Sequence, residues 1–347
     1  ALQRLVNIEY FGDPRFQPLN FLPTLASYLL FGTRFFFHYI VSILYHVLCA
    51  WTFLALYDLL QNRKTRGFFA LFGQYPIEAT VFLVLFSAGD VLWWSFFHYV
   101  QVATLLAYLG LAVFLRGAWS ARSGMPGFAL IILACLIYEP FIVVLGVLGV
   151  LSIANRKSLS MLRTVELVVP IAFTVFILST WLKGYSVTET RLEPVMGQFQ
   201  GYVLETGHTR LLGTPFAENH LLFTLYNFSI LLWNLLTHTF WSAKYSLVNI
   251  YEFSVASWIQ GPGVLVSALL LLIATCVLAW RARQKESPQY WQTAFIYFLC
   301  GLGVFFVIAW GRNRDGNFPS VQLRYLYVVL PVLLALLLDC LRRNLAA

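Results

Sequence analysis

The sequence of 347 residues is 60% hydrophobic and 11% charged, and its mean hydropathy is +0.74. A soluble domain is about half apolar and about one quarter charged, so this composition excludes a soluble globular protein and predicts an integral membrane protein. The net charge of +8 arises from basic loops between apolar segments, so it gives no reason to expect a nucleic-acid partner.

The apolar segments have the length of transmembrane helices. A crossing needs about 20 apolar residues, because each residue adds about 1.5 Å to a helix that must span about 30 Å of hydrocarbon. The ten-residue alternation of an outer-membrane barrel does not fit the pattern. We predict an all-α polytopic integral membrane protein, a single transmembrane domain over residues 1–347, with nine crossings near 35–60, 67–85, 91–115, 126–138, 140–154, 165–183, 262–281, 291–310 and 322–341.

The fourth and fifth crossings are short for full spans. Tyr138, Glu139 and Pro140 are therefore expected to form the tip of a tight hairpin. The alternative is one long helix over 126–154, kinked at Pro140. The hairpin is favoured because it puts the basic residues that precede and follow the pair on one face of the membrane.

The distribution of basic residues predicts the orientation of the chain. If odd-numbered crossings run inward, one face holds most of the basic loop residues and few acids, so this face is predicted to be cytoplasmic. The basic residues on it are Arg63, Lys64, Arg66, Arg116, Arg122, Arg156, Lys157, Arg163, Arg281, Arg283, Lys285, Arg342 and Arg343.

Two segments are predicted to lie on the opposite, outer face. Residues 184–260 form one large external loop, in which the apolar run 221–241 is expected to lie at headgroup level, because a crossing there would invert every later loop. Residues 1–34 are interpreted as the remnant of a first external loop. An upstream crossing is expected to precede them, since they carry no signal-peptide pattern.

Several arginines of the outer face suit phosphate recognition, because the planar guanidinium pairs well with phosphate oxygens. They are Arg15, Arg34, Arg312, Arg314 and Arg324. The alternative for each is ordinary anchoring at a helix end.

The acids Asp13, Glu78, Asp90 and Glu139 are predicted to lie at or below the outer surface, where a carboxylate is costly and usually functional or paired. Glu139 is the sharpest candidate, because it follows a purely apolar stretch at a proline turn. Its alternative is a salt bridge to Arg324 or a capping role.

Histidines and cysteines point less clearly to chemistry. His38 and His98 lie near the outer ends of their helices and could contact a phosphate or a hydroxyl, whereas His46 is deep in its helix and is expected to be a hydrogen-bonded packing residue. No motif predicts a metal site. The five cysteines lie in apolar segments and are interpreted as packing residues without a disulfide framework: Cys49, Cys135, Cys276, Cys300 and Cys340.

Four short segments resemble motifs of the polytopic GT-C glycosyltransferases, especially bacterial relatives of the tetratricopeptide-linked O-mannosyltransferases. They are RFQPL at 15–19, YPIEATVFLVLFSAGD at 75–90, YEP at 138–140 and LRYLYVVLP at 323–331. The chain departs from the family pattern at Gln17, Ser42, Thr80, Tyr138 and Leu323. These departures weaken the expectation of catalytic activity more than the expectation of the fold.

The resemblance implies transfer of a sugar from a polyprenyl-phosphate donor to an acceptor on the outer face of a bacterial inner membrane, in the cell envelope. Asp13 and Glu139 would be the catalytic carboxylates. Arg15, Arg312 and Arg324 would bind the donor phosphate. His38, Glu78 and Asp90 are further candidates, and no cofactor is expected beyond the lipid-linked donor.

Two other functions remain open. The departures from the family pattern, together with 11 tryptophans and 31 phenylalanines, are also typical of a catalytically inactive scaffold subunit of a membrane complex. A polysaccharide polymerase or ligase would likewise have many crossings and a large external loop, in which Arg191, His208, Arg210 and His220 would be available.

Overall fold

The computed structural model describes residues 19–61, 68–87, 98–119, 124–154, 288–312 and 323–346, with a few isolated positions between 168 and 277. The helices are α2 (Leu22–Phe31), α3 (Phe35–Leu60), α4 (Phe68–Gln74), α5 (Pro76–Ser87), α7 (His98–Trp119), α8 (Met125–Ile137), the 3-10 turn η3 (Glu139–Phe141), α9 (Ile142–Ala154), α15 (Pro288–Arg312) and α16 (Leu323–Ala346). A short antiparallel pair, β1 (Arg210–Leu211) and β2 (Thr214–Pro215), is the exception to an otherwise helical described chain.

Three of the described helices, α3, α7 and α15, are long and apolar enough to cross a membrane. The chain is therefore a membrane protein with transmembrane helices, as its composition predicts. The number of nine crossings stays a prediction. The predicted crossings 165–183 and 262–281 and the external loop 184–260, with its segment 221–241, lie outside the described residues except at isolated positions.

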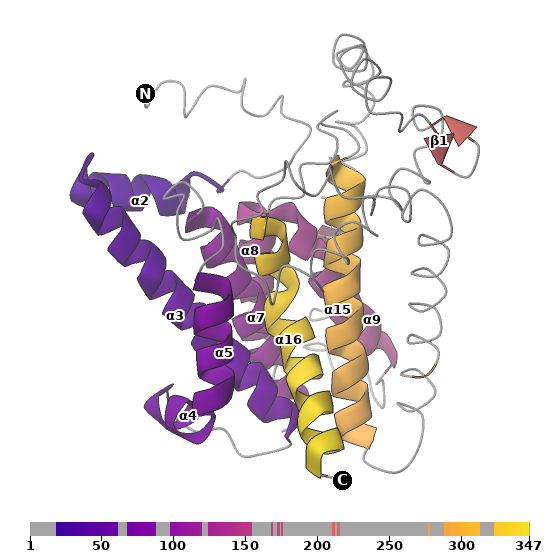
Figure 1. Ribbon diagram of the computed structural model, residues 1–347. Helices are drawn as coiled ribbons and strands as arrows, with labels where there is room; N and C mark the ends of the chain where they lie inside the picture. The colour runs from indigo at the N-terminus through magenta and orange to yellow at the C-terminus, as the bar shows by residue number, and fades with distance from the viewer. Residues whose placement is uncertain are drawn as a thin grey trace.

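The long helices pack side by side as a bundle, in which α3, α7 and α16 contact one another and α15 contacts α16 (Figure 1). α3, α7 and α16 run the same way. Gln101, in the first turn of α7, contacts Ser42 near the start of α3, and Asp339, near the end of α16, contacts Gln61 just after the end of α3. α15 runs the opposite way, because its first turn contacts Asp339 through Tyr290. These directions agree with the alternation that the predicted topology requires.

The bundle thus has two ends, each defined by a carboxylate. The Glu139 end comprises η3, the beginnings of α3, α7 and α16 and the end of α15. The Asp339 end comprises the ends of α3 and α16, the short helix α4 and the beginning of α15.

The central helix α3 changes its environment along its length. Its last nine residues, 52–60, are all buried in the bundle. Its first half buries only one stripe, which includes His38, Ser42 and His46, because residues four positions apart lie on the same face of a helix. The rest of the first half is mostly apolar and is exposed or half-buried, so this part of α3 leaves the core.

The predicted crossing 67–85 is wrong as a single helix. The chain forms α4 and α5, separated at Tyr75. The reason is Pro76, which begins α5: a proline disfavours helical geometry in the preceding residue but fits the first turn of a helix. The remaining helix α5 has 12 residues, short of a full span.

The segment 126–154 breaks at Tyr138, as the hairpin interpretation expects. Tyr138 has extended backbone angles, and its ring contacts Tyr99 at the beginning of α7, with 6.0 Å between centroids. Phe141 then contacts Tyr108, further along α7, at 5.7 Å. α8 therefore runs antiparallel to α7. The chain then reverses through η3 into α9, which contacts α15.

Three cysteines, Cys49, Cys135 and Cys300, are buried packing residues as predicted. Cys340 is exposed instead, because it lies on the outward side of the last turns of α16, next to the buried Asp339. The expectation that it packs in the core is wrong. Cys276 lies outside the described residues.

Candidate functional site

The Glu139 end collects the backbone positions of several predicted site residues. Glu139 begins η3, Arg312 ends α15 and Arg324 is in the first turn of α16. α15 also contacts η3 directly. Asp13, Arg15 and Asp90, which were predicted to join them, lie outside the described residues.

Glu139 is a buried carboxylate at the beginning of a helical turn. Its residue is 8% exposed, and it is followed by Pro140 and the first turn of α9. A negative charge is favourable at this position, because the free N–H groups of a helix N-terminus carry partial positive charge. The aromatic rings of Tyr138 and Phe141 contact each other at 6.2 Å on either side of it and fix the turn.

His38 is tied to the neighbouring chain by both ring nitrogens. Its Nε2 lies 2.8 Å from the carbonyl oxygen of Gly32 and must donate to it, and its Nδ1 is hydrogen-bonded to the hydroxyl of Ser27 at 2.6 Å. The same residue's backbone oxygen accepts from Nε2 of His98 at 3.2 Å. His38 therefore joins α2 to α3 through both ring nitrogens, and a role in proton transfer would require these bonds to break.

The two deeper members of the buried stripe of α3 also bridge helices. Ser42 donates to the amide oxygen of Gln101 at 3.1 Å, and the amide nitrogen of Gln101 donates to the backbone oxygen of Ser42 at 3.0 Å. His46 contacts the hydroxyl of Tyr327 in α16 at 3.1 Å. Such bonds hold transmembrane helices together, so the expectation that His46 is a hydrogen-bonded packing residue is confirmed.

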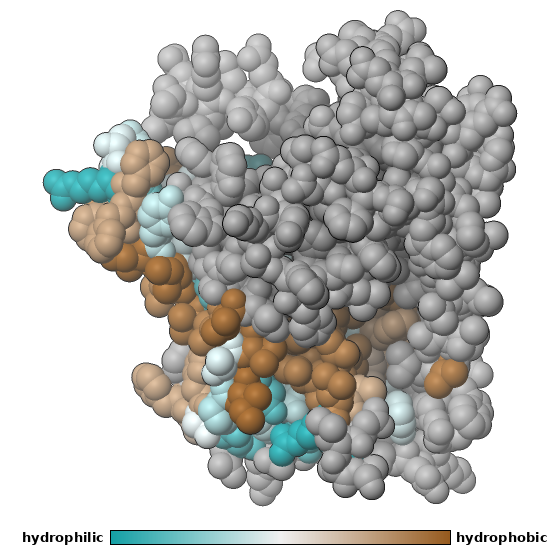
Figure 2. Space-filling model, viewed as in Figure 1, coloured by the Kyte–Doolittle hydropathy of each residue, from teal (hydrophilic) through white to brown (hydrophobic). Residues whose placement is uncertain are grey.

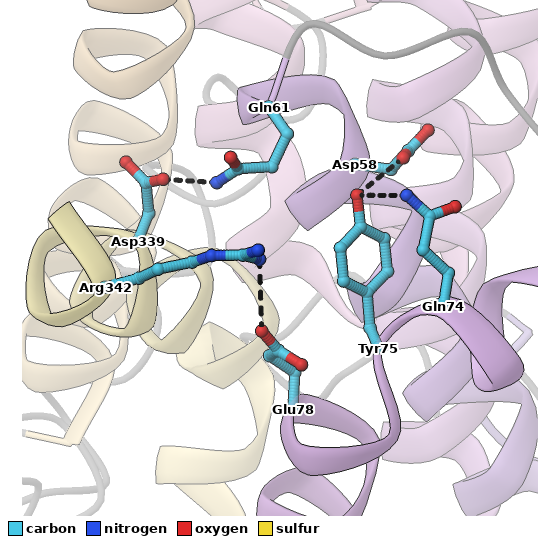
Figure 3. A network of polar contacts seen from close by, with 7 residues as sticks. All are labelled: Asp58, Gln61, Gln74, Tyr75, Glu78, Asp339 and Arg342. Atoms are coloured by element: carbon cyan, nitrogen blue, oxygen red, sulfur yellow. Dashed lines mark hydrogen bonds and ion pairs between the residues drawn. The ribbon is translucent and has the colours of Figure 1, made fainter. Parts of the chain in front are cut away.

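The Asp339 end holds the densest polar network of the described residues (Figure 3). Asp339 is 1% exposed and accepts three hydrogen bonds from three places. One oxygen accepts from Gln61, after α3, and the other accepts from the Tyr290 hydroxyl at 2.5 Å and from Arg343 Nε at 3.0 Å. The Arg343 guanidinium also lies over the Tyr290 ring, 3.9 Å from its centroid.

A second part of this network secures the break between α4 and α5. The hydroxyl of Tyr75 donates to Asp58 at 2.9 Å and accepts from the side-chain amide of Gln74 at 3.0 Å (Figure 3). Asp58 also lies in the field of the Arg116 guanidinium. The carboxylate of Asp58 thus connects α3 with the break and with α7.

Glu78 lies at the Asp339 end, which corrects its predicted place among the outer acids. Its carboxylate is 3.7 Å from the guanidinium of Arg342 (Figure 3). The physical reason is the break at Tyr75, which puts Glu78 in the first turn of α5 instead of midway along a long crossing. It cannot act together with Glu139 or His38, which lie at the other end.

The pair of Glu78 and Arg342 is partly exposed and is expected to contribute little to stability. The neighbouring Tyr57 hydroxyl, and to a smaller extent the Glu78 carboxylate, raise the pKa of Arg342, so the guanidinium keeps its charge at every accessible pH. The Arg342 side chain is 49% exposed. Glu78→Gln should therefore lower the free energy of unfolding by at most about 1 kcal/mol. Unfolding in mixed micelles measures this value, and a loss above about 2 kcal/mol would contradict it.

Sequence reasoning did not identify Asp58, Gln61, Tyr75, Tyr290 and Asp339 as a group. The signal was present in the two acids, since Asp58 and Asp339 each stand within three residues of the end of an apolar run. The partners could not be found, because they are separated by up to 278 positions in the chain.

Comparisons with protein-family models, curated proteins and solved structures give no match to this chain.

Proposed function

We propose that the protein is a GT-C-type glycosyltransferase that uses a polyprenyl-phosphate-linked sugar as donor at its Glu139 end. The observation that supports the proposal is the buried residue Glu139, in a turn at the end of the bundle where α15 ends at Arg312 and Arg324 lies in the first turn of α16. An acid and two cationic positions at one end of a membrane bundle are what transfer from a lipid phosphate needs.

The proposed chemistry divides two tasks between these groups. A carboxylate, either Glu139 or Asp13 of the preceding segment, accepts the proton of the acceptor hydroxyl or amide as its oxygen or nitrogen bonds to the sugar carbon. The bond between that carbon and the phosphate oxygen breaks at the same time, and the electron pair leaves with the phosphate. Arg15, Arg312 and Arg324 would stabilise the charge that gathers on the phosphate.

The test measures consumption of the donor in membranes that retain their own acceptors, because this readout does not require the acceptor to be identified. Membrane vesicles that contain the full chain are supplied with a polyprenyl-phosphate-linked radiolabelled sugar, and loss of label from the lipid phase is followed. Glu139→Gln and Arg324→Ala should each reduce the rate about 100-fold or more. The matched control is Glu78→Gln, a change of the same chemical kind at the opposite end, which should leave the rate unchanged.

Equal rates in the wild type, Glu139→Gln and Arg324→Ala would remove these residues from the reaction. Equal loss in Glu78→Gln and Glu139→Gln would show a general effect on folding instead of a local effect on chemistry.

A scaffold subunit is the second candidate. The observation that favours it is the use of His38, Ser42 and His46 in bonds between helices, since this leaves the polar stripe of α3 structural. A scaffold predicts no donor consumption by the wild type in membranes that retain their own acceptors, and a stoichiometric membrane partner cross-linked to the Glu139 end. Donor consumption that is lost in Glu139→Gln would exclude a scaffold role.

A further inference from the structure

The corner between α2 and α3 combines exposed apolar side chains with a single cation. We define it by Tyr28, Leu29, Leu30, Arg34, Phe35 and Phe36. All six are exposed, with Leu29 and Leu30 at 72% and 75%. Arg34 is the only Asp, Glu, Lys or Arg in the sequence between residues 16 and 57. The apolar surface continues from this corner along the first half of α3 (Figure 2).

The corner is held in a fixed shape by the residues on its inner side. Gly32 ends α2 with φ +58° and ψ −133°, a conformation that essentially only glycine adopts, and this lets the chain turn sharply into α3. Ser27 and Gly32 both bond to the ring of His38, and the backbone N–H of Leu19 donates to Leu136. These bonds on the inner side of the corner hold the exposed side chains of its outer side in a fixed arrangement.

The position of α2 suits the level of lipid headgroups. α2 lies across the end of the bundle, whereas α3, α15 and α16 run along it (Figure 1). A helix in this position lies in the plane of the membrane interface when the long helices span the bilayer. Tyrosine is favoured at this level, and arginine there meets lipid phosphates.

We propose that this corner is a binding site for an anionic phospholipid, with Arg34 on the headgroup phosphate and Leu29, Leu30, Phe35 and Phe36 against the acyl chains. The positive charge of Arg34 favours an anionic lipid over an apolar protein partner at this corner. No acidic residue stands near Arg34 in the sequence, and none of the ion pairs among the described residues includes it. A protein partner with an apolar surface would leave this cation buried without a counter-charge, whereas an anionic lipid supplies both apolar chains and negative charge.

The experiment places a fluorophore at the corner and asks which lipid approaches it. The full chain carrying Leu30→Cys and Cys340→Ser is labelled with bimane and reconstituted in phosphatidylcholine bilayers. Quenching is compared for nitroxide-labelled phosphatidylglycerol and nitroxide-labelled phosphatidylcholine. We expect the anionic lipid to be preferred about five-fold. The preference should disappear in Arg34→Gln and persist partly in Arg34→Lys, which keeps the charge but loses the planar guanidinium.

The control is Arg342→Gln, which removes one positive charge at the other end and should leave the preference unchanged. Added inorganic phosphate should not displace the lipid, since it offers no acyl chains. The proposal is overturned if the two lipids quench equally with Arg34 present, if the preference survives Arg34→Gln, or if neither lipid quenches because protein covers the corner. None of these outcomes depends on glycosyl transfer.

Discussion

Asp339→Ala is expected to lower the free energy of unfolding by about 3 kcal/mol. The carboxylate is buried and accepts hydrogen bonds from Gln61, Tyr290 and Arg343. Removal leaves the amide of Gln61 and the hydroxyl of Tyr290, both half-buried, without their acceptor. The loss of the Asp339 acceptor costs Arg343 less free energy, because its side chain is 53% exposed and water can replace the carboxylate. Titration with SDS in mixed micelles measures the difference.

Two further variants separate the hydrogen bonds from the charge. Asp339→Asn keeps one acceptor oxygen and should cost about half as much as alanine. Tyr290→Phe combined with Asp339→Ala should cost less than the two single changes added together, by at least about 0.5 kcal/mol, because both remove the same bond. Strict additivity, or a loss below about 1 kcal/mol for Asp339→Ala, would show that the network does not hold α3, α15 and α16 together.

Gly127→Ala is expected to lower the free energy of unfolding by about 2 kcal/mol, although alanine is the better helix former. α7 and α8 approach so closely at Gly110 and Gly127 that a Cβ on Gly127 would lie 2.6 Å from the Gly110 carbonyl oxygen and 2.8 Å from Phe114. The oxygen belongs to the backbone of α7, so it cannot move without separating the helices. Small residues allow such contacts between membrane helices.

Gly146 in α9 offers a matched control for this change. No atom lies within 4 Å of the Cβ that a substitution there would add. Gly146→Ala should therefore raise the free energy of unfolding, by up to about 1 kcal/mol, through helix propensity alone. The same substitution thus has opposite signs at two glycines of adjacent apolar helices. A loss at Gly146 equal to that at Gly127 would contradict the packing argument.

Local sequence pattern predicted the long helices well. The span 35–60 matches α3 in both bounds, and 126–138, 140–154 and 291–310 differ from α8, α9 and α15 by a few residues at their ends. The length of each apolar run predicts these helices, because a segment that crosses a bilayer must form its backbone hydrogen bonds internally, as a helix does. The pattern failed at residues 67–85, where Pro76 splits an apolar run without changing its hydropathy.

The candidate site was less predictable, because its members come from distant parts of the chain. The YEP turn marked Glu139, and the structure puts it at the same end as Arg312 and Arg324. His38 was predicted as a contact for a phosphate or acceptor. In the structure both of its ring nitrogens bond to Ser27 and Gly32, which no spacing in the sequence could reveal.

Composition and hydrophobic length determined by themselves that this is a helical membrane protein, and they placed most of its described helices, since both properties depend on transfer of each segment from water to hydrocarbon. Only the tertiary structure decided which polar groups share an end of the bundle. It separated Glu78 from Glu139 and joined Asp339 to Gln61 and Tyr290. The reason is that a buried carboxylate must find donors wherever the fold supplies them, and sequence distance does not limit that choice.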